Sequence, residues 1–306
     1  MLQTSINFLY RLPKATLKKY KRFGGYYNYQ KILNGNKQMA RAAHKLPPSV
    51  SYADGLPIHF LTGEKFIHQT LFCIRSLIKV SNEQFHFILV DDGTFTIEIS
   101  KLIAAQLPEA TIIPLAQVTA NIEKHLPADK FPVLNHKRKV YPHIKKLIDI
   151  HIATPHTWKL VLDSDMLFWK EPATIINWLK QPSQPIHMLD CNESYGYSEK
   201  LMSALSNSAI PKLLNVGVIG LNSSAIQWDV IESWVKQLEE SEGTSYYLEQ
   251  ALSAMIVGDT AACVLAENDY KVNPSLADLE SKANILHHYV DLSKEIYLKK
   301  AWQLIL

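Results

Sequence analysis

The chain has 306 residues, of which 47% are hydrophobic and 20% are charged. A chain of this length can bury a sizeable core, and its composition excludes wholesale intrinsic disorder. The net charge of +3 is too small to indicate a nucleic-acid-binding protein.

The three cysteines are widely spaced and form neither a disulfide framework nor a zinc-binding pattern. No run of about 18 apolar residues is present, so no transmembrane helix is expected. The first residues also lack the charged lead-in of a secretory signal. These features predict a cytoplasmic protein.

The N-terminal stretch is basic, since residues 1–53 contain ten Lys and Arg but no Asp or Glu. We therefore expect a basic N-terminal extension over residues 1–55 and a main domain over residues 56–306. Aromatic and aliphatic side chains lie among the basic ones. Two roles are therefore open for the extension: it contacts an anionic membrane surface, or it is an arm packed on its own domain.

Strand and helix patterns alternate after residue 56. Apolar runs predict strands, and apolar residues recurring at intervals of three and four predict helices. The predicted strands cover 58–61, 85–90, 111–115, 160–162, 186–189 and 216–221. The predicted helices cover 66–78, 95–107, 141–152 and 228–238. This alternation predicts an α/β fold with a mainly parallel central sheet and helices on both faces.

Polar residues follow the predicted strands. Thr62 and Gly63 come after the first strand, Asp91 and Asp92 after the second, and Asp190 after a later one. Ligands of such sheets bind beyond the carboxyl ends of the strands. A glycine there lets the backbone approach a ligand, and a helix start favours negative charge. Asp91 or Asp92 could hydrogen-bond a base or a ribose.

Asp163, Ser164 and Asp165 directly follow the predicted strand 160–162. Residues two apart in an extended chain face the same way, so the two carboxylates can point together while Ser164 points aside. Such a pair suits Mg or Mn carrying a diphosphate. The tripeptide alone is a weak signal, but two carboxylates at a buried strand end are costly without a cation. A metal site is therefore favoured over a solvated turn. Lys139, Lys145 and Lys146 precede this strand, and the sequence does not select which one reaches the diphosphate.

The segment LVLDSDMLF, residues 160–168, resembles the Asp-x-Asp motif of GT-A glycosyltransferases, most closely glycosyltransferase family 8, the glycogenin and lipopolysaccharide galactosyltransferase group. Three further segments resemble this family in the same order along the chain. They are Asn215-Val216-Gly217-Val218, Glu249-Gln250-Ala251-Leu252, and His288-Tyr289 followed by Lys294. The resemblance covers roughly residues 57–302 and implies a GT-A-like catalytic domain.

The resemblance also implies roles for individual residues. His288 would be the third metal ligand beside Asp163 and Asp165, and Lys294 would contact the donor phosphates. The donor sugar would be lined by Asn215, Gly217, Glu249 and Gln250, and Asp190 would contact the sugar or the acceptor. His287 would face the other side of its strand. The implied activity is metal-dependent transfer of a hexose from a UDP-sugar to a saccharide or lipid-linked acceptor, with retention of configuration.

Departures from the family pattern keep the stereochemistry open, among them the absence of the Pro-Trp pair that follows the lysine in the family, with Trp302 displaced. Asp291 stands where the family has a glycine, and the segment Asp91-Asp92-Gly93-Thr94 resembles instead the inverting family 2. In a retaining enzyme Gln250 would lie by the anomeric carbon, whereas an inverting enzyme needs a general base, for which Glu249 or Asp190 could serve. Two competing functions are a nucleotidyltransferase that makes nucleotide sugars and a non-catalytic carbohydrate- or membrane-binding relative.

Overall fold

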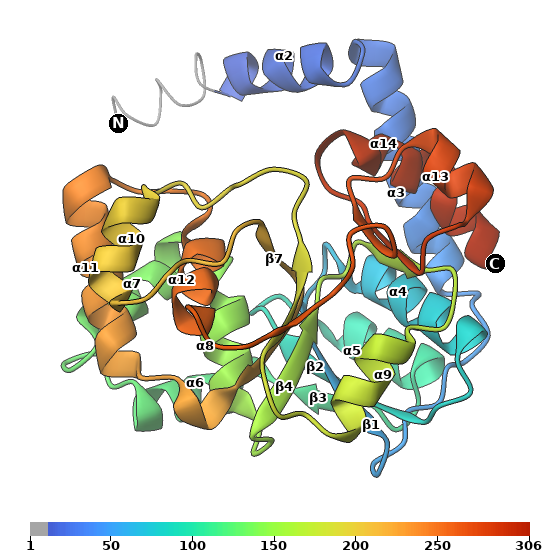
Figure 1. Ribbon diagram of the computed structural model, residues 1–306. Helices are drawn as coiled ribbons and strands as arrows, with labels where there is room; N and C mark the ends of the chain where they lie inside the picture. The colour runs from blue at the N-terminus through green and yellow to red at the C-terminus, as the bar shows by residue number, and fades with distance from the viewer. Residues whose placement is uncertain (1–11) are drawn as a thin grey trace.

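The computed structural model describes residues 12–306 and contains a seven-stranded central sheet in the order β3-β2-β1-β4-β7-β6-β8 (Figure 1). Only β7 runs antiparallel to its neighbours, so the predicted α/β fold with a mainly parallel sheet is confirmed. The strands of this sheet are β1 (Leu56–Thr62), β2 (Phe85–Asp91), β3 (Thr111–Ile113), β4 (Trp158–Leu162), β6 (Ile186–Leu189), β7 (Leu214–Asn222) and β8 (Cys263–Val264).

A second sheet of three short strands lies beside the end of β4. It consists of β5 (Met166–Phe168), β10 (Leu286–His288) and β9 (Tyr270–Val272), in the order β5-β10-β9. Only residues 163–165 separate β4 from β5, so the Asp-x-Asp tripeptide is the connection between the two sheets. The tripeptide is therefore anchored by a strand at each of its ends.

Helices cover both faces of the central sheet, as predicted. Alternate residues of β2 face opposite cores, with Phe87 and Leu89 in one and Ile88 and Val90 in the other. The first core includes residues of α4 (Ile67–Val80), α5 (Ile97–Gln106), α9 (Ala173–Lys180) and α13 (Leu276–Ser281). The second includes residues of α6 (Leu115–His125), α7 (Pro132–Val140), α8 (Ile144–Ala153), α10 (Glu199–Ser206), α11 (Trp228–Glu242) and α12 (Leu248–Val257).

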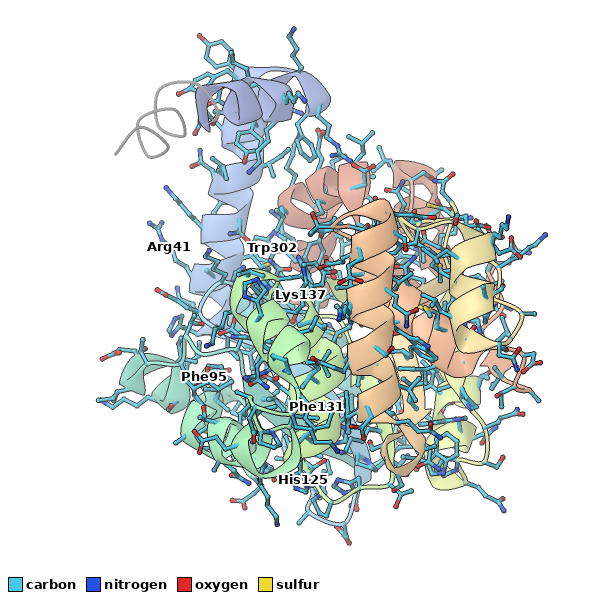
Figure 2. The ribbon with its side chains drawn as sticks, turned by 90° about the vertical axis from the view of Figure 1, so that its left-hand side faces the viewer. Arg41, Phe95, His125, Phe131, Lys137 and Trp302 are labelled. Atoms are coloured by element: carbon cyan, nitrogen blue, oxygen red, sulfur yellow. The ribbon has the colours of Figure 1, made fainter. Side chains whose placement is uncertain are left out.

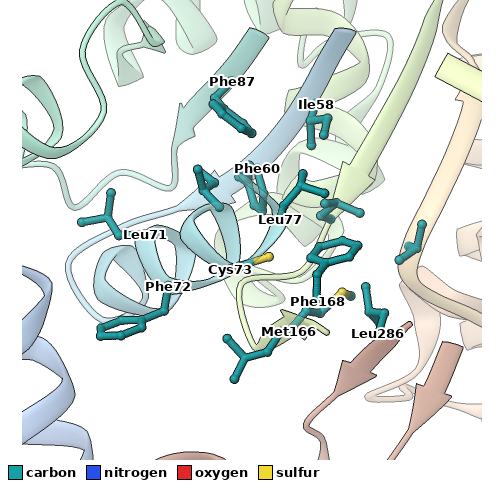
Figure 3. Close-up of a cluster of buried hydrophobic side chains, with 14 of the residues drawn as sticks. Ile58, Phe60, Leu71, Phe72, Cys73, Leu77, Phe87, Met166, Phe168 and Leu286 are labelled. Carbon is teal, nitrogen blue, oxygen red and sulfur yellow. The ribbon is translucent and has the colours of Figure 1, made fainter. Parts of the chain in front are cut away.

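The first core joins the two sheets. Phe60 of β1 and Cys73 of α4 lie in the same buried cluster as Phe168 of β5 and Leu286 of β10 (Figure 3). Full burial of an apolar side chain stabilises the fold by about 1.5–3 kcal/mol. This packing therefore fixes the second sheet, and the ends of the Asp-x-Asp connection, against the first.

The N-terminal part of the described chain forms two helices, α2 (Leu12–Arg22) and α3 (Tyr26–Ala43), which together are called the N-terminal arm below. Figures 1 and 2 show α2 on the outside of the body, with α3 joining it to the domain. Ile32, Met39 and Ala43 of α3 are buried. α3 packs against α4 and against α14 (Lys294–Lys299). Residues of α3 thus share the first core, while Lys18, Lys19 and Lys21 of α2 are exposed to solvent.

The remaining elements are short 3₁₀ turns: η2 (Ser223–Ala225), η3 (Asp291–Ser293) and η4 (Ala301–Ile305). Within residues 12–306, no helix has both the length and the apolar character needed to cross a lipid bilayer.

Candidate active site

The Asp-x-Asp connection is fixed by backbone hydrogen bonds on both sides. The N–H of Asp163 donates to the carbonyl of Gly217 in β7 at 2.8 Å, and the carbonyl of Asp165 accepts from the N–H of Tyr289 at 2.9 Å. The tripeptide is therefore held between β7 and the chain that follows β10. This arrangement brings His288, which is distant in sequence, to the two carboxylates.

Asp163, Asp165 and His288 form a compact group of potential metal ligands. The Nε2 atom of His288 lies 3.5 Å from Oδ2 of Asp163 and 3.4 Å from Oδ1 of Asp165. One ligand atom from each residue lies within 4.8 Å of the others, which is close enough for a single ion. Two carboxylates and an imidazole form a donor set that fits Mn or Mg better than a soft metal. The predicted ligands are thus brought together.

His288 fills the space that the missing side chain of Gly217 leaves open. A Cβ atom at position 217 would lie 2.4 Å from Cε1 of His288 and 2.5 Å from its Nδ1. No larger residue can therefore occupy position 217 while His288 keeps this position. The predicted role of Gly217 in lining the donor sugar stays a prediction, and the structure adds a role in seating His288.

Two lysines flank the carboxylates. Nζ of Lys146 lies 2.8 Å from Oδ1 of Asp163 and 2.9 Å from the carbonyl of Val216, and its side chain is only 11% exposed. Nζ of Lys294 lies 3.2 Å from Oδ2 of Asp165, and its side chain is 45% exposed. Lys294 is thus close to the ligand group yet still accessible to a bound phosphate.

Of the three lysines that the sequence left open, Lys146 is the one that contacts Asp163, and which of them reaches a diphosphate stays a prediction. The neighbouring Lys145 donates instead to the carbonyl of Asp92 at 2.6 Å. Both lysines lie in α8, and Lys146 reaches Asp163, which directly follows β4.

The charges of this cluster balance one another. Burial alone would raise the pKa of Asp163, but Lys146 and His288 hold it below its usual value. Burial alone would lower the pKa of His288, but hydrogen bonds to Asp163 and Asp165 raise it to about 9. A protonated His288, together with Lys146 and Lys294, thus compensates the two ionised carboxylates.

Asp190, Asn215 and Gln250 meet in a second polar cluster. Oδ2 of Asp190 accepts from Nδ2 of Asn215 at 2.9 Å and from Nε2 of Gln250 at 3.3 Å. Oδ1 of Asn215 accepts from the N–H of Gly217 at 2.9 Å, which connects this cluster to the strand beside His288. Residues predicted to contact the sugar are therefore brought together next to the metal ligands.

Glu249 precedes Gln250 in the chain and lies beside Lys146 of the first cluster. It is buried at the start of α12, and its Oε2 lies 3.7 Å from Nζ of Lys146, which also contacts Asp163. Burial raises the pKa of Glu249 to about 7, Lys146 opposes this rise, and Asp163 adds to it. A carboxyl group with this pKa can accept or release a proton near neutral pH.

Thr62 and Ser164 belong to the interior. Their hydroxyl groups each lie 2.8 Å from that of Thr70, a residue of α4 that the sequence did not single out. The side chain of Thr62 has no exposed surface, and its contact with a donor stays a prediction. Ser164 does point away from the carboxylates. The hydrogen bonds between the hydroxyl groups of Thr62, Thr70 and Ser164 anchor the tripeptide to α4.

Asp91 and Asp92 shape the loop after β2. One carboxylate oxygen of Asp91 accepts from the N–H groups of Gly93, Thr94 and Phe95, so this side chain holds its own turn. The carboxylate of Asp92 accepts from Thr94 and lies against Gly63. Gly63 and Asp92 thus sit side by side at the carboxyl ends of β1 and β2, and their contact with a donor stays a prediction.

His287 faces away from the ligand group, as expected. Its Nε2 lies 2.9 Å from Oδ1 of Asn284, and its Nδ1 accepts from the indole N–H of Trp169 at 2.9 Å. The side chain is fully buried. His287 is therefore part of the packing of the second sheet and not of the ligand group.

Similarity of this chain to known proteins is found among solved structures. No protein-family model and no curated protein sequence matches the chain. Several solved structures, however, match the chain. A structure of the bifunctional glycosyltransferase WbbM has a TM-score of 0.53 at 11% identity, covering 85% of this chain and 52% of WbbM. This chain thus spans about half the length of WbbM.

Two structures of the galactosyltransferase LgtC are similar along most of their length. An active-site mutant of LgtC has a TM-score of 0.51 at 13% identity, covering 76% of this chain and 86% of LgtC. A complex of LgtC with donor and acceptor sugar analogs has a TM-score of 0.50 at 13% identity, covering 82% and 100%. The chain therefore has the GT-A glycosyltransferase fold that the sequence motifs predicted.

Proposed function

We propose that this protein is a metal-dependent glycosyltransferase that transfers a hexose from a nucleotide diphosphate sugar, with UDP-hexose as the donor. One observation carries the proposal. Asp163, Asp165 and His288 converge at the carboxyl end of β4, and a polar cluster lies directly beside them. The first group suits a cation that carries a diphosphate, and the second suits the hydroxyl groups of a sugar.

The ligand group would hold Mn or Mg. When bound, the ion neutralises the charge that develops on the departing nucleotide diphosphate. Lys294 lies 3.2 Å from Asp165 and remains accessible, so its ammonium group can pair with the same phosphates. Lys146 is too buried for this task and instead holds Asp163 in place.

The cluster of Asp190, Asn215 and Gln250 would bind and orient the transferred hexose. We propose retention of configuration, with Gln250 beside the anomeric carbon and Asp190 orienting its amide. In the alternative inverting reaction, Glu249 would accept the proton of the acceptor hydroxyl, and its raised pKa of about 7 is compatible with that role.

The acceptor would be a saccharide or a lipid-linked saccharide. A lipid-linked acceptor would give the basic N-terminal region a role, because Leu17 and Tyr27 are exposed among its lysines. Basic helices with exposed apolar and aromatic side chains bind anionic membrane surfaces from the cytoplasmic side. Residues 1–11 of this region lie outside the described residues.

A donor-hydrolysis screen tests the proposal. The protein is incubated with a panel of nucleotide sugars in Mn²⁺ or in EDTA, and released sugar is followed by proton NMR, which also reports its anomeric configuration. We expect the wild type to release sugar from a UDP-hexose only when the metal ion is present. The Asp163→Asn variant should lose this activity. Formation of a nucleotide sugar from a nucleoside triphosphate would indicate a nucleotidyltransferase, and binding without turnover would indicate a non-catalytic relative.

A further inference from the structure

The chain between His288 and Lys294 connects the metal ligand to the phosphate-contacting lysine. Asp291 lies at its midpoint, in the 3₁₀ turn η3, with a φ of 48°. This left-handed conformation is unfavourable for a residue with a side chain, and it persists where neighbouring contacts determine it. The geometry of residues 288–294 therefore depends on what holds them.

One side of this segment is held by the second sheet. The N–H of Asn273 donates to the carbonyl of His288 at 2.9 Å, and the N–H of Ser293 donates to Oδ1 of Asn273 at 3.2 Å. Asn273 directly follows β9, so these bonds extend the pairing of β9 with β10. They fix the two ends of the turn but leave Asp291 itself to other contacts.

The other side is held by the N-terminal arm. The guanidinium group of Arg22, the last residue of α2, forms an ion pair with the carboxylate of Asp291. Nδ2 of Asn28 donates to Oε1 of Glu295 at 2.8 Å, and Oδ1 of Asn28 accepts from Lys299 at 2.9 Å. The arm thus contacts the segment at its midpoint and along the helix α14 that Lys294 begins.

The backbones of α3 and α14 also approach closely. A Cβ atom at Gly35 would lie 2.0 Å from the carbonyl oxygen of Leu298, so only glycine permits this packing. The contact fixes α14 against a buried part of α3. Asn28 therefore acts from a firmly seated helix, whereas Arg22 belongs to α2, which lies on the outside of the body (Figure 2).

We infer that the N-terminal arm positions Lys294 for the donor phosphates, with Arg22 as a positioning residue that acts through Asp291. The inference rests on the proposed function, since it assumes that Lys294 contacts a nucleotide diphosphate. The ion pair between Arg22 and Asp291 holds the turn at Asp291, and this turn determines where α14 begins. Lys294 is the first residue of α14 and lies 3.2 Å from Asp165.

Charge reversal with a matched control tests this inference on the full chain. Arg22→Glu places two carboxylates together, whereas Lys21→Glu makes the same change of charge one residue earlier in α2. Two quantities are measured without lipid: the affinity for UDP in the presence of Mn²⁺ by titration calorimetry, and hydrogen exchange of the backbone amides of residues 289–299. Arg22→Lys keeps the positive charge and serves as the rescue variant.

We expect Arg22→Glu to weaken UDP binding about fivefold and to speed exchange in residues 289–299, in line with the modest strength of exposed ion pairs. Lys21→Glu and Arg22→Lys should match the wild type in both measurements, and Asn28→Ala should change both in the same direction as Arg22→Glu. Equal behaviour of Arg22→Glu and Lys21→Glu in both measurements would overturn the inference. If the wild type does not bind UDP, the proposed function fails, while hydrogen exchange still tests the role of the arm.

Discussion

The surroundings of Asp163 and Asp165 explain why both carboxylates are ionised. Each carboxylate has a lysine within 3.2 Å, and both are close to Nε2 of His288. Neighbouring cations lower the pKa of a carboxyl group, so both remain ionised at neutral pH. They therefore offer negatively charged oxygen atoms to a divalent ion without having to lose a proton first.

Substitution of His288 tests the ligand group. Because an imidazole nitrogen completes the set of three ligands, we expect His288→Ala to weaken Mn²⁺ binding by about tenfold or more. Titration calorimetry with Mn²⁺ measures the change. His287→Ala is the matched control, since His287 packs against Trp169 and Asn284 and should affect thermal stability but not metal affinity. Equal losses of affinity in both variants would contradict the assignment.

Gly217→Ala tests the seating of His288. The added Cβ would lie 2.4 Å from the imidazole ring, so we expect His288 to shift and Mn²⁺ affinity to fall several-fold. Gly220→Ala in the same strand would collide with Trp178 instead, at 2.5 Å. Both variants should unfold at lower temperature because overpacking costs about 1–3 kcal/mol. Only Gly217→Ala should lose metal affinity, and unchanged binding in it would disprove the steric role.

The sequence alone identified the paired carboxylates because the signal is local: a buried strand that ends in two acidic residues. Lys146 and Thr70 could not be selected in this way. Lys146 is one of three lysines ahead of β4, and only the folded chain shows which one reaches Asp163. Thr70 looks like an ordinary residue of an amphipathic helix until Ser164 and Thr62 are placed beside it.

At the scale of elements, α7 illustrates stabilisation by a distant helix. Its N-cap residue, Phe131, has no side chain that can accept a hydrogen bond. Glu232 of α11 supplies the missing acceptor, because its two carboxylate oxygens accept from the N–H groups of Val133 and Leu134 at 2.7 and 2.8 Å. Lys137 of α7, labelled in Figure 2, also pairs with Glu239 of α11.

Removal of this cap should cost as much as removal of a side-chain cap within a helix. We expect Glu232→Ala to lower the free energy of unfolding by about 1–2 kcal/mol. Urea denaturation followed by circular dichroism measures the change. Glu240→Ala, an exposed position of the same helix, should change stability by less than about 0.5 kcal/mol. A loss no larger than that of the control would show that water replaces the cap.

Long elements with strong periodicity were predictable, whereas short strands were not. β2 and α4 are confirmed within one or two residues because their apolar patterns are uninterrupted. β5 and β9 have three residues each and carry no recognisable pattern of their own. The antiparallel direction of β7 also could not be read, since an apolar run is the same in either direction.

At the scale of the whole molecule, buried histidines make stability depend on pH. Burial is the largest of the effects that lower the pKa values of His59, His68, His151 and His287. The pKa falls to about 3 for His151 and to about 4 for His68 and His287. Below a pH of about 6.5 the unfolded chain binds more protons at these sites than the folded chain. These four histidines therefore cost no stability above that pH, and their cost grows as the pH falls toward 4.

We expect the melting temperature to fall between pH 7 and pH 5, since each such histidine costs about 1.4 kcal/mol per pH unit below 6.5. Glu249 has a raised pKa, so its contribution has the opposite sign and offsets about one histidine. Differential scanning calorimetry of the wild type and of His151→Asn isolates one site. The variant should show a shallower decline, and parallel curves would contradict the assignment.

The whole fold brings the two carboxylates of one connection, Asp163 and Asp165, together with His288 from a distant part of the chain, at one point between two sheets. Binding of UDP measured by titration calorimetry, in Mn²⁺ and in EDTA, tests this claim most directly. The account predicts binding to the wild type in Mn²⁺, little or none in EDTA, and little or none to the Asp163→Asn/Asp165→Asn variant in either condition. Equal UDP affinity with and without the ion, or in the variant and the wild type, would contradict it.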